Sequence, residues 1–180
     1  MPELNHKTLW QIQKELKPKA EVIANEIKNR DDYNNFMKFF DFLKDNKLTP
    51  RWQSVNKWSV NYKSKLICHI SINLLMGSGA HDDGWRVSNN GFIKGLLVNE
   101  YDKYIINDKL KEFIWDNIKF PPCSCKPDCK GMQDIAIMGR QFGNVCRCWP
   151  ISFKNPSEDR LAYSKDWIIA VKNFITDFKH

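Results

Sequence analysis

The chain has 180 residues, a formal net charge of +7 and an apolar fraction of 42%, with 13% aromatic residues. This length and aromatic content are typical of one folded domain and exclude a disordered chain. Because a membrane helix needs about 20 apolar residues and no such run occurs, the sequence predicts no membrane contact through a spanning helix.

The first 46 residues carry helical signals. Thr8 and Gln11 fit a capping box at the start of a first helix, which Pro18 interrupts because a proline restricts the residue before it. Apolar residues at helical intervals predict a longer helix over residues 32–46. We expect residues 1–46 to form a helical N-terminal cap.

The middle of the chain alternates apolar and polar residues. Residues 58–62 and 66–74 alternate on either side of a short turn, which predicts an antiparallel hairpin with one buried face. Trp85 and Val87 are expected to begin a further strand. The Asn-Gly pair at 90–91 then predicts a tight turn into a partner strand over residues 92–98.

Helices and short strands alternate in the C-terminal third. A helix over residues 108–117 precedes a cysteine-rich loop, 121–148, and short strands are expected at 135–138 and 149–153. Asn155 is the predicted cap of the final helix, whose apolar positions form one stripe. The stripe consists of Leu161, Ser164, Trp167, Ile168, Val171, Phe174, Ile175 and Phe178.

This order of elements predicts a single α+β domain over residues 1–180. The helical cap, 1–46, would be followed by a hinge at 46–53 and a sheet-containing body, 50–178. In the body we expect an antiparallel sheet of about five strands with helices packed on one face.

Five of the six cysteines fall within 26 residues. Thiols at this density in a loop are typical of a site that uses their chemistry. Zinc at a structural site takes four thiolate or imidazole ligands in a tetrahedron, and the flanking basic residues would offset the charge of four thiolates. We therefore predict a zinc or other soft-metal site. Its candidate ligands are Cys123, Cys125, Cys129, Cys146 and Cys148.

The spacing of these cysteines leaves two alternatives open. Both thiols of a Cys-x-Cys pair reach one ion only if the backbone turns there, because extended backbone points alternate side chains to opposite faces. The thiols could instead form a redox or nucleophilic enzyme site, assisted by His69 or His81, or be bystanders in a tight loop. Cys68 lies on an apolar strand face and is predicted to be a core thiol.

Tryptophans near the predicted strands form a second candidate site. Trp58, Trp85 and Trp149 could line a pocket for a flat or cationic small molecule, with His69 on a polar strand face beside them. The alternative is that the tryptophans build the core. Nucleic-acid binding through the basic loop is a weaker alternative, because 22 Lys against 6 Arg are spread along the chain and not clustered on one element.

Three stretches resemble a group of small bacterial α+β proteins that have a Trp-rich hairpin, a Cys-rich loop and no established activity. They are RWQSVNKWSVNYKSKLICHI, LKEFIWDNIKFPPCSCKPDCKG and IAIMGRQFGNVCRCW, and the resemblance spans about residues 50–178. The shared marks are Cys125, Cys129, Gly139, Phe142 and Cys146. The resemblance implies the α+β fold and a prokaryotic, cytosolic setting.

These observations together favour a non-catalytic binding protein. Its cysteine loop would hold zinc, and an aromatic pocket would take a small molecule. A cytoplasmic location is expected, because the first ten residues lack the apolar segment of an export signal.

Overall fold

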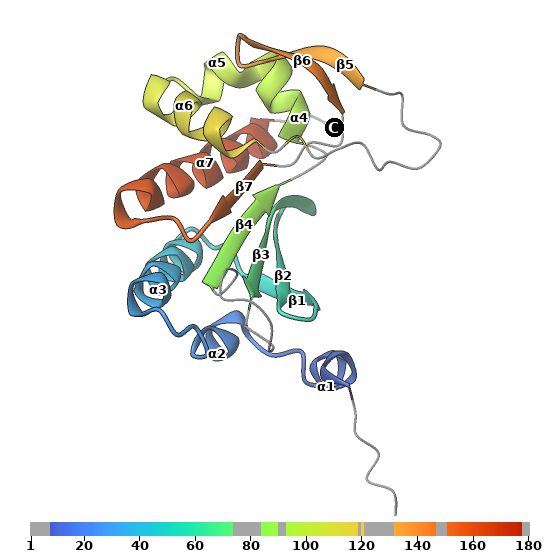
Figure 1. Ribbon diagram of the computed structural model, residues 1–180, viewed down its shortest axis with the longest axis vertical. Helices are drawn as coiled ribbons and strands as arrows, with labels where there is room; N and C mark the ends of the chain where they lie inside the picture. The colour runs from blue at the N-terminus through green and yellow to red at the C-terminus, as the bar shows by residue number, and fades with distance from the viewer. Residues whose placement is uncertain are drawn as a thin grey trace, which may run out of the picture.

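The structure, a computed structural model, describes residues 8–73, 84–89, 93–118, 120, 132–146 and 151–177. Figure 1 shows its main sheet, the helices beside it and a separate two-stranded hairpin. The helices are α1 (Leu9–Leu16), α2 (Ala20–Ala24), α3 (Arg30–Asp45), α4 (Ile93–Gly95), the π-helical turn η1 (Leu96–Glu100), α5 (Tyr101–Tyr104), α6 (Asp108–Asn117) and α7 (Glu158–Asp177). The strands are β1 (Pro50–Ser54), β2 (Lys57–Tyr62), β3 (Lys65–Asn73), β4 (Gly84–Asn89), β5 (Met132–Ile137), β6 (Arg140–Cys146) and β7 (Ile151–Lys154). Among the described helices, none combines the length and the apolar character that crossing a membrane requires.

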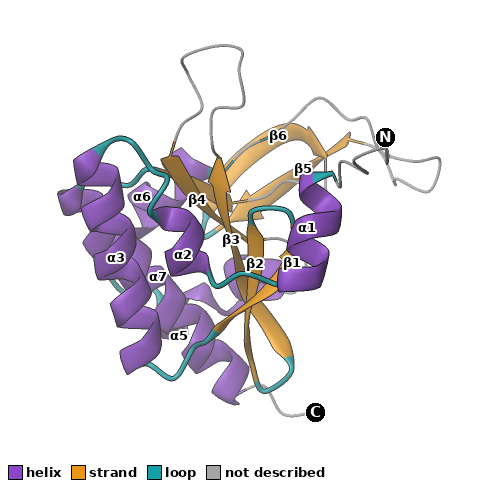
Figure 2. Ribbon diagram, turned by 90° about the horizontal axis from the view of Figure 1, so that it is seen from below, coloured by secondary structure: helices purple, strands orange, loops and turns teal. Residues whose placement is uncertain are grey.

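Five strands form an antiparallel sheet in the order β1-β2-β3-β4-β7, and β5 and β6 form the separate hairpin. Helices α3, α6 and α7 pack against one face of the five-stranded sheet. Figure 2 shows these helices on one side of the strands. The predicted α+β fold, with a five-stranded antiparallel sheet and helices on one face, is confirmed. The predicted N-terminal helix and its capping box at Thr8 and Gln11 are present as well.

The core lies between the helices and the sheet face that they cover. One row of residues across the strands consists of Trp58, Ile70, Val87 and Phe153, each at most 1% exposed. The apolar stripe of α7 faces this core: the seven predicted residues that lie in the helix are all buried. Phe178, the eighth, lies outside the described residues. Burial of such apolar surface is the main stabilising contribution to folding, at about 25 cal/mol per Å².

Helix α1 is attached to the sheet by a polar contact. Gln13 is its buried residue, and its side chain donates to Asn56 Oδ1 at 2.6 Å and accepts from the Asn56 N–H at 2.9 Å. Leu9 and Ile12 are about two-fifths exposed, and Leu16 is 72% exposed. The apolar repeat of this helix therefore faces outward, although periodicity alone favours burial of such a repeat.

Residues 93–104 are helical, so the strand expected over residues 92–98 is wrong for 93–98. Leu96 and Leu97 are both fully buried. Adjacent residues of a strand point to opposite faces, whereas adjacent residues of a helix can both contact a core on one side. Two neighbouring buried leucines therefore fit a helix better than a half-buried strand.

The periodicity of the sequence did not indicate two of the strands. β1 occupies part of the predicted hinge, and β6 lies inside the predicted cysteine-rich loop. β1 contains Pro50 and an irregular register between Trp52 and Ser54, so it shows no clean alternation. Each of these strands is stabilised by pairing with the strand next to it in the chain. This pairing is a tertiary contact, which the local preferences of the residues do not indicate.

Asn155 does not cap the final helix, which begins at Glu158. Its Oδ1 instead accepts a hydrogen bond from the Trp85 N–H at 2.6 Å. Gly84 lies directly against this amide, with a φ of +123° that residues bearing a Cβ rarely adopt, and a Cβ there would come within 2.2 Å of Asn155 Oδ1. The start of β4 thus favours glycine.

A buried polar network joins β3, β4 and α7. The pairing of β2 with β3 slips between Val60 and Asn61, which leaves Ile67 opposite no residue of β2. The freed carbonyl of Ile67 accepts a hydrogen bond from Asn89 Nδ2, and Asn89 Oδ1 accepts one from Trp167 Nε1 at 3.0 Å. Asn89 is 2% exposed. A single side chain therefore satisfies two buried groups that water cannot reach.

Asn89→Ala should lower the free energy of unfolding by about 2–4 kcal/mol, because it leaves the Ile67 carbonyl and the Trp167 indole N–H without partners. Urea denaturation followed by tryptophan fluorescence measures this change. The matched control is Asn61→Ala at an exposed position, where we expect a change within about 0.5 kcal/mol. Equal stability of the two variants would show that the Asn89 network is dispensable.

Candidate anion-binding surface

The sheet face opposite the helices is polar. Strand alternation turns two rows of residues toward it, and we call these ten residues the outer face. The first row is Arg51, Ser59, His69, Ser88 and Ser152, and the second is Ser54, Lys57, Ser71, Arg86 and Lys154. Each row crosses all five strands, and strand pairing places Arg86 directly opposite Lys154, 68 positions away in the sequence.

The charge on this sheet has one sign. Its five strands contain five lysine and arginine residues and no aspartate or glutamate, although the chain has 21 acidic residues. Arg51, Lys57 and Arg86 form no ion pair within the described part of the chain. Uncompensated cations that lie close together create a positive potential that attracts anions.

Serine hydroxyl groups fill the space between these cations. Ser59, Ser71, Ser88 and Ser152 are all partly accessible, and neighbouring strands lie about 4.8 Å apart. Their short side chains lie lower on the face than the longer basic side chains beside them. Because a hydroxyl group both donates and accepts hydrogen bonds, these serines suit a ligand that is rich in oxygen atoms.

Two buried nitrogen atoms of the outer face have no hydrogen-bond partner among the described residues: His69 Nδ1 and Arg86 Nε. They belong to adjacent strands, because His69 pairs with Ser88 and Arg86 pairs with Ser71. Buried polar atoms without a partner are rare in folded proteins. Because both atoms are shielded from solvent, a ligand would reach them only after the surrounding side chains move. A third such atom, Trp85 Nε1, lies on the helix-covered face of the sheet and is unrelated to this surface.

Two effects favour the neutral form of the His69 imidazole. Burial lowers its pKa, and the positive charge of Lys57 lowers it further. His69 is 9% exposed. An anion placed beside this ring would favour the protonated form and would thus draw a proton onto it.

The predicted aromatic pocket is not assembled from the residues that the structure describes. Trp58 and Trp85 lie on the helix-covered face and are each 1% exposed, whereas His69 lies on the opposite face. Trp58 Nε1 donates to the Pro18 carbonyl at 2.8 Å. Trp85 packs against Phe36 and Phe39 of α3, with ring centroids 5.5 and 5.4 Å apart. Trp149 lies outside the described residues.

Most of the predicted metal ligands also lie outside the described residues: Cys123, Cys125, Cys129 and Cys148, together with His81. Cys146 is the last residue of β6, and its backbone pairs with that of Met132, the first residue of β5. Among the described residues, no three His, Cys, Asp or Glu side chains gather as metal ligands. The metal site therefore stays a prediction. Cys68 is fully buried as expected, and burial raises the pKa of its thiol.

The β5–β6 hairpin, which lies inside the cysteine-rich segment 121–148, is fixed to the helices of the protein. The Met138 N–H donates to the Leu97 carbonyl of η1 at 2.9 Å, and Trp115 Nε1 of α6 donates to the Ile137 carbonyl at 2.8 Å. Met138, at a φ of 49°, and Gly139, at 78°, form its tight turn. The first and last residues of this anchored hairpin, Met132 and Cys146, are thus paired at its open end.

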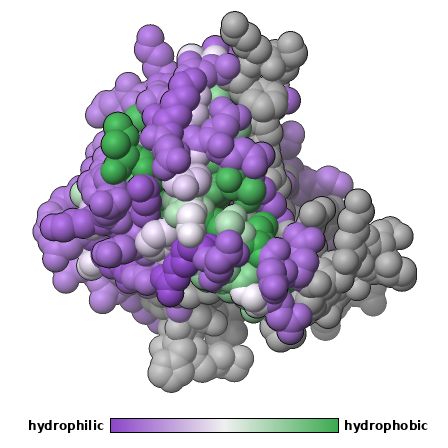
Figure 3. All heavy atoms as spheres, turned by 90° about the horizontal axis from the view of Figure 1, so that it is seen from above, coloured by the Kyte–Doolittle hydropathy of each residue, from purple (hydrophilic) through white to green (hydrophobic). Residues whose placement is uncertain are grey.

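The end of the molecule that carries α4, α5, α6 and the β5–β6 hairpin is a poorer candidate for a binding site. Figure 3 looks onto this end and shows a largely hydrophilic surface with limited apolar patches. Its exposed large apolar residues include Val98 and Ile106. Scattered apolar residues of this kind are normal on protein surfaces.

Comparisons with known proteins identified no relative: no protein-family model matches the chain, and neither a curated protein nor a solved structure matches it. The resemblance to the bacterial α+β group thus stays a prediction. We infer the class of ligand from the chemistry of the outer face.

The pKa of His69 should be measurable by NMR titration of its imidazole, and we expect a value below the unperturbed value of about 6.5. Between the folded and unfolded values the unfolded chain binds more protons, so stability should rise with pH across this window and level off above it. Urea denaturation at pH 5–8 would show this rise, and His69→Gln should reduce it. A titration midpoint at or above about 6.5 would contradict the assignment.

Proposed function

We propose that this protein is a non-catalytic binding protein whose outer face takes up a phosphate-bearing anion. The single observation that carries the proposal is the charge of this face: four of its ten residues, Arg51, Lys57, Arg86 and Lys154, are basic and none is acidic.

Phosphate fits these residues better than a simple carboxylate does. The guanidinium group of Arg86 presents up to five N–H donors, and paired donation to phosphate oxygens is among the stronger hydrogen-bonding arrangements in proteins. Ser71 lies directly opposite Arg86, and Lys57 lies directly opposite Ser71. A phosphate group can therefore use a guanidinium, a hydroxyl and an ammonium group from three adjacent strands.

Binding without turnover is favoured by the composition of the same face. An acid–base mechanism needs a paired proton donor and acceptor at one place, and the described outer face holds His69 with no carboxylate to orient it. The surrounding cations suit a ligand whose charge stays negative throughout. We therefore assign the surface to recognition of an anion.

Isothermal titration with inorganic triphosphate at low salt tests this proposal, and we expect saturable binding to the intact chain. Arg86→Gln should weaken the affinity at least about tenfold, because it removes a charged donor from the centre of the face. The matched control is Arg30→Gln on the exposed start of α3, which should leave the affinity within about twofold. Absence of binding, or equal losses in both variants, would refute the assignment.

We also propose that the cysteine-rich segment holds zinc. The pairing of Met132 with Cys146 supports this second proposal. These two residues adjoin the two cysteine-bearing parts of the segment, and their pairing brings them together at one end of the hairpin. Closely spaced flanks favour a site whose ligands come from both sides of the segment. Such a site would stabilise the hairpin end and is chemically independent of the anion-binding face.

Metal analysis of protein purified without chelator should give about one zinc per chain, with four thiols that react only after unfolding. A free-thiol assay before and after denaturation provides the second readout. Cys68 is the internal control, since its burial should protect its thiol whether or not metal is present. Metal-free protein with one or two rapidly alkylated thiols would instead support the redox or nucleophilic alternative.

A further inference from the structure

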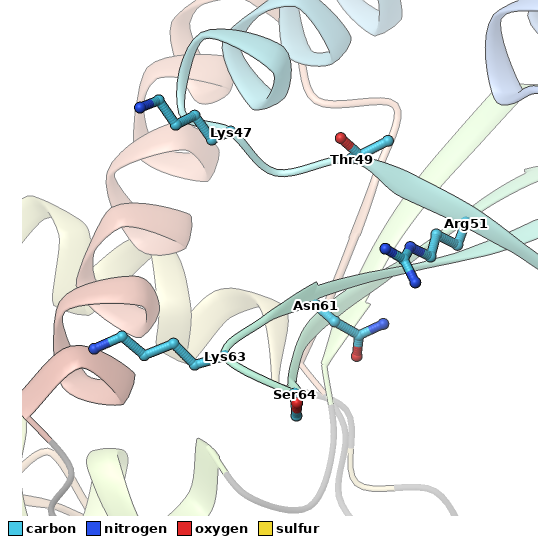
Figure 4. Close-up of a pocket in the computed structure, with 6 residues that line it drawn as sticks. All are labelled: Lys47, Thr49, Arg51, Asn61, Lys63 and Ser64. Atoms are coloured by element: carbon cyan, nitrogen blue, oxygen red, sulfur yellow. The ribbon is translucent and has the colours of Figure 1, made fainter.

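An open hollow lies at the β1 edge of the outer face. It has a volume of about 500 Å³ and is bounded by the connection that leads into β1 and by the turn between β2 and β3. Figure 4 shows Lys47 and Lys63 extending in the same direction from these two walls. The lining residues are Lys47, Thr49, Arg51, Asn61, Lys63 and Ser64, so three are cationic and none is acidic.

Two of these cations, Lys47 and Lys63, are held in an unusual backbone conformation. Lys47, Arg51 and Lys63 form no ion pair within the described ranges, but Lys63 acts on a carboxyl group of α7: hydrogen bonds to Lys103 and Tyr104 lower the pKa of Asp177, and the charge of Lys63 lowers it further. Lys47, Lys63 and Ser64 have φ values of 59°, 46° and 62°. Left-handed backbone is unfavourable for residues that carry a side chain, and a turn like that at 63–64 ordinarily uses Asn-Gly. The hollow therefore keeps basic and hydroxyl side chains where glycine would be less strained.

The hollow continues the outer face, because Arg51 belongs to both. From β1 to β7 there are four spacings between strands of about 4.8 Å each, or about 19 Å in all. One phosphate group contacts only donors within about 3 Å of its oxygens. One ligand would therefore engage all of these cations only if it carries several phosphates in line.

The outer-face residues form a narrow band, or track. Its two rows are two residues apart along β2, β3, β4 and β7, which is about 7 Å. One backbone suffices to cover a band of this width, and a duplex bound across its minor groove, about 6 Å wide, is the alternative that the duplex measurement tests. A narrow band of cations thus fits a single phosphate backbone. The described outer face also has no aromatic side chain on which bases could stack, so backbone contacts would dominate.

We propose that the phosphate-bearing ligand is a single nucleic-acid strand whose backbone runs from this hollow across the outer face. The inference rests on the proposed function and specifies its ligand class. At about 3.4 Å of rise per nucleotide, the 19 Å track corresponds to about six nucleotides of stacked strand. Binding should be largely independent of base sequence and steeply dependent on salt.

Fluorescence anisotropy with oligothymidylates of 3, 6, 9 and 12 nucleotides, at 50 and 200 mM salt, tests this inference. Affinity should rise with length up to about six nucleotides and then level off apart from the statistical gain of extra registers. Lys63→Gln should weaken binding of the 12-mer several-fold and reduce the slope of log affinity against log salt by about 0.7. Its affinity for inorganic triphosphate, which binds at Arg86, should stay unchanged.

Two further variants distinguish the loss of a charge in the track from a loss of charge elsewhere on the protein. Lys109→Gln on the exposed side of α6 removes the same charge away from the track and should leave the 12-mer affinity unchanged. Lys47→Gln tests the opposite wall of the hollow, so the inference does not depend on one turn residue. Thermal melting of each variant confirms that the fold is retained.

Each result supports or overturns a defined statement. Triphosphate binding with an affinity for oligonucleotides that does not depend on length would overturn the single-strand inference and leave the proposed anion site intact. Tighter binding of a 12-base-pair duplex or of a polyglutamate peptide would overturn the inference in favour of that polyanion. If neither triphosphate nor oligonucleotide binds, the proposed function and this inference both fall.

Discussion

The hydrogen bonds of Asn89 are the constraint on which the rest of the sheet depends. Because Ile67 is left out of the β2–β3 ladder, its buried carbonyl needs another donor, and the Asn89 amide supplies it while accepting from Trp167. In a low-dielectric core a lost partner costs more than it would in water. The register after the bulge is thereby fixed, with Ile70 turned to the core and His69 turned outward.

That register decides where the charge of the protein lies. A slip of one residue in β3 would turn His69 and Ser71 into the core and expose Ile70, so burial of the apolar row stabilises the arrangement that displays the polar rows. Arg86 and Lys154 then lie directly opposite each other. Like charges in such a pair repel and destabilise a sheet, and a bound anion would relieve this repulsion. Stability and the proposed binding therefore act through the same residues.

The two proposed sites are held by different parts of the fold. The outer face belongs to the five-stranded sheet, whereas the hairpin beside the cysteine-rich segment is fixed to η1 and α6 through Leu97 and Trp115. Within the described ranges the two sets of contacts have no side chain in common, so loss of one anchor should leave the other surface in place. An anion on the sheet and a metal beside the hairpin can consequently be tested independently.

The sequence by itself determined the class of fold. Helical spacing in residues 161–175 and alternation in residues 68–72 are local patterns, and each was enough to predict an element and its buried side. The same reasoning failed at residues 93–98. The Asn-Gly turn signal led to a predicted strand there, whereas two adjacent leucines, Leu96 and Leu97, are both buried in a helical segment.

Only the tertiary structure decided the candidate site. In sequence, the lysines and arginines are dispersed among acidic residues and indicate little beyond a basic protein. Strand pairing places Lys57, Arg86 and Lys154 in one row, and it separates His69 from the tryptophans near which it was predicted to lie. The pairs that join β4 to β3 and β7 link residues 11 to 68 positions apart, and no local periodicity contains that information.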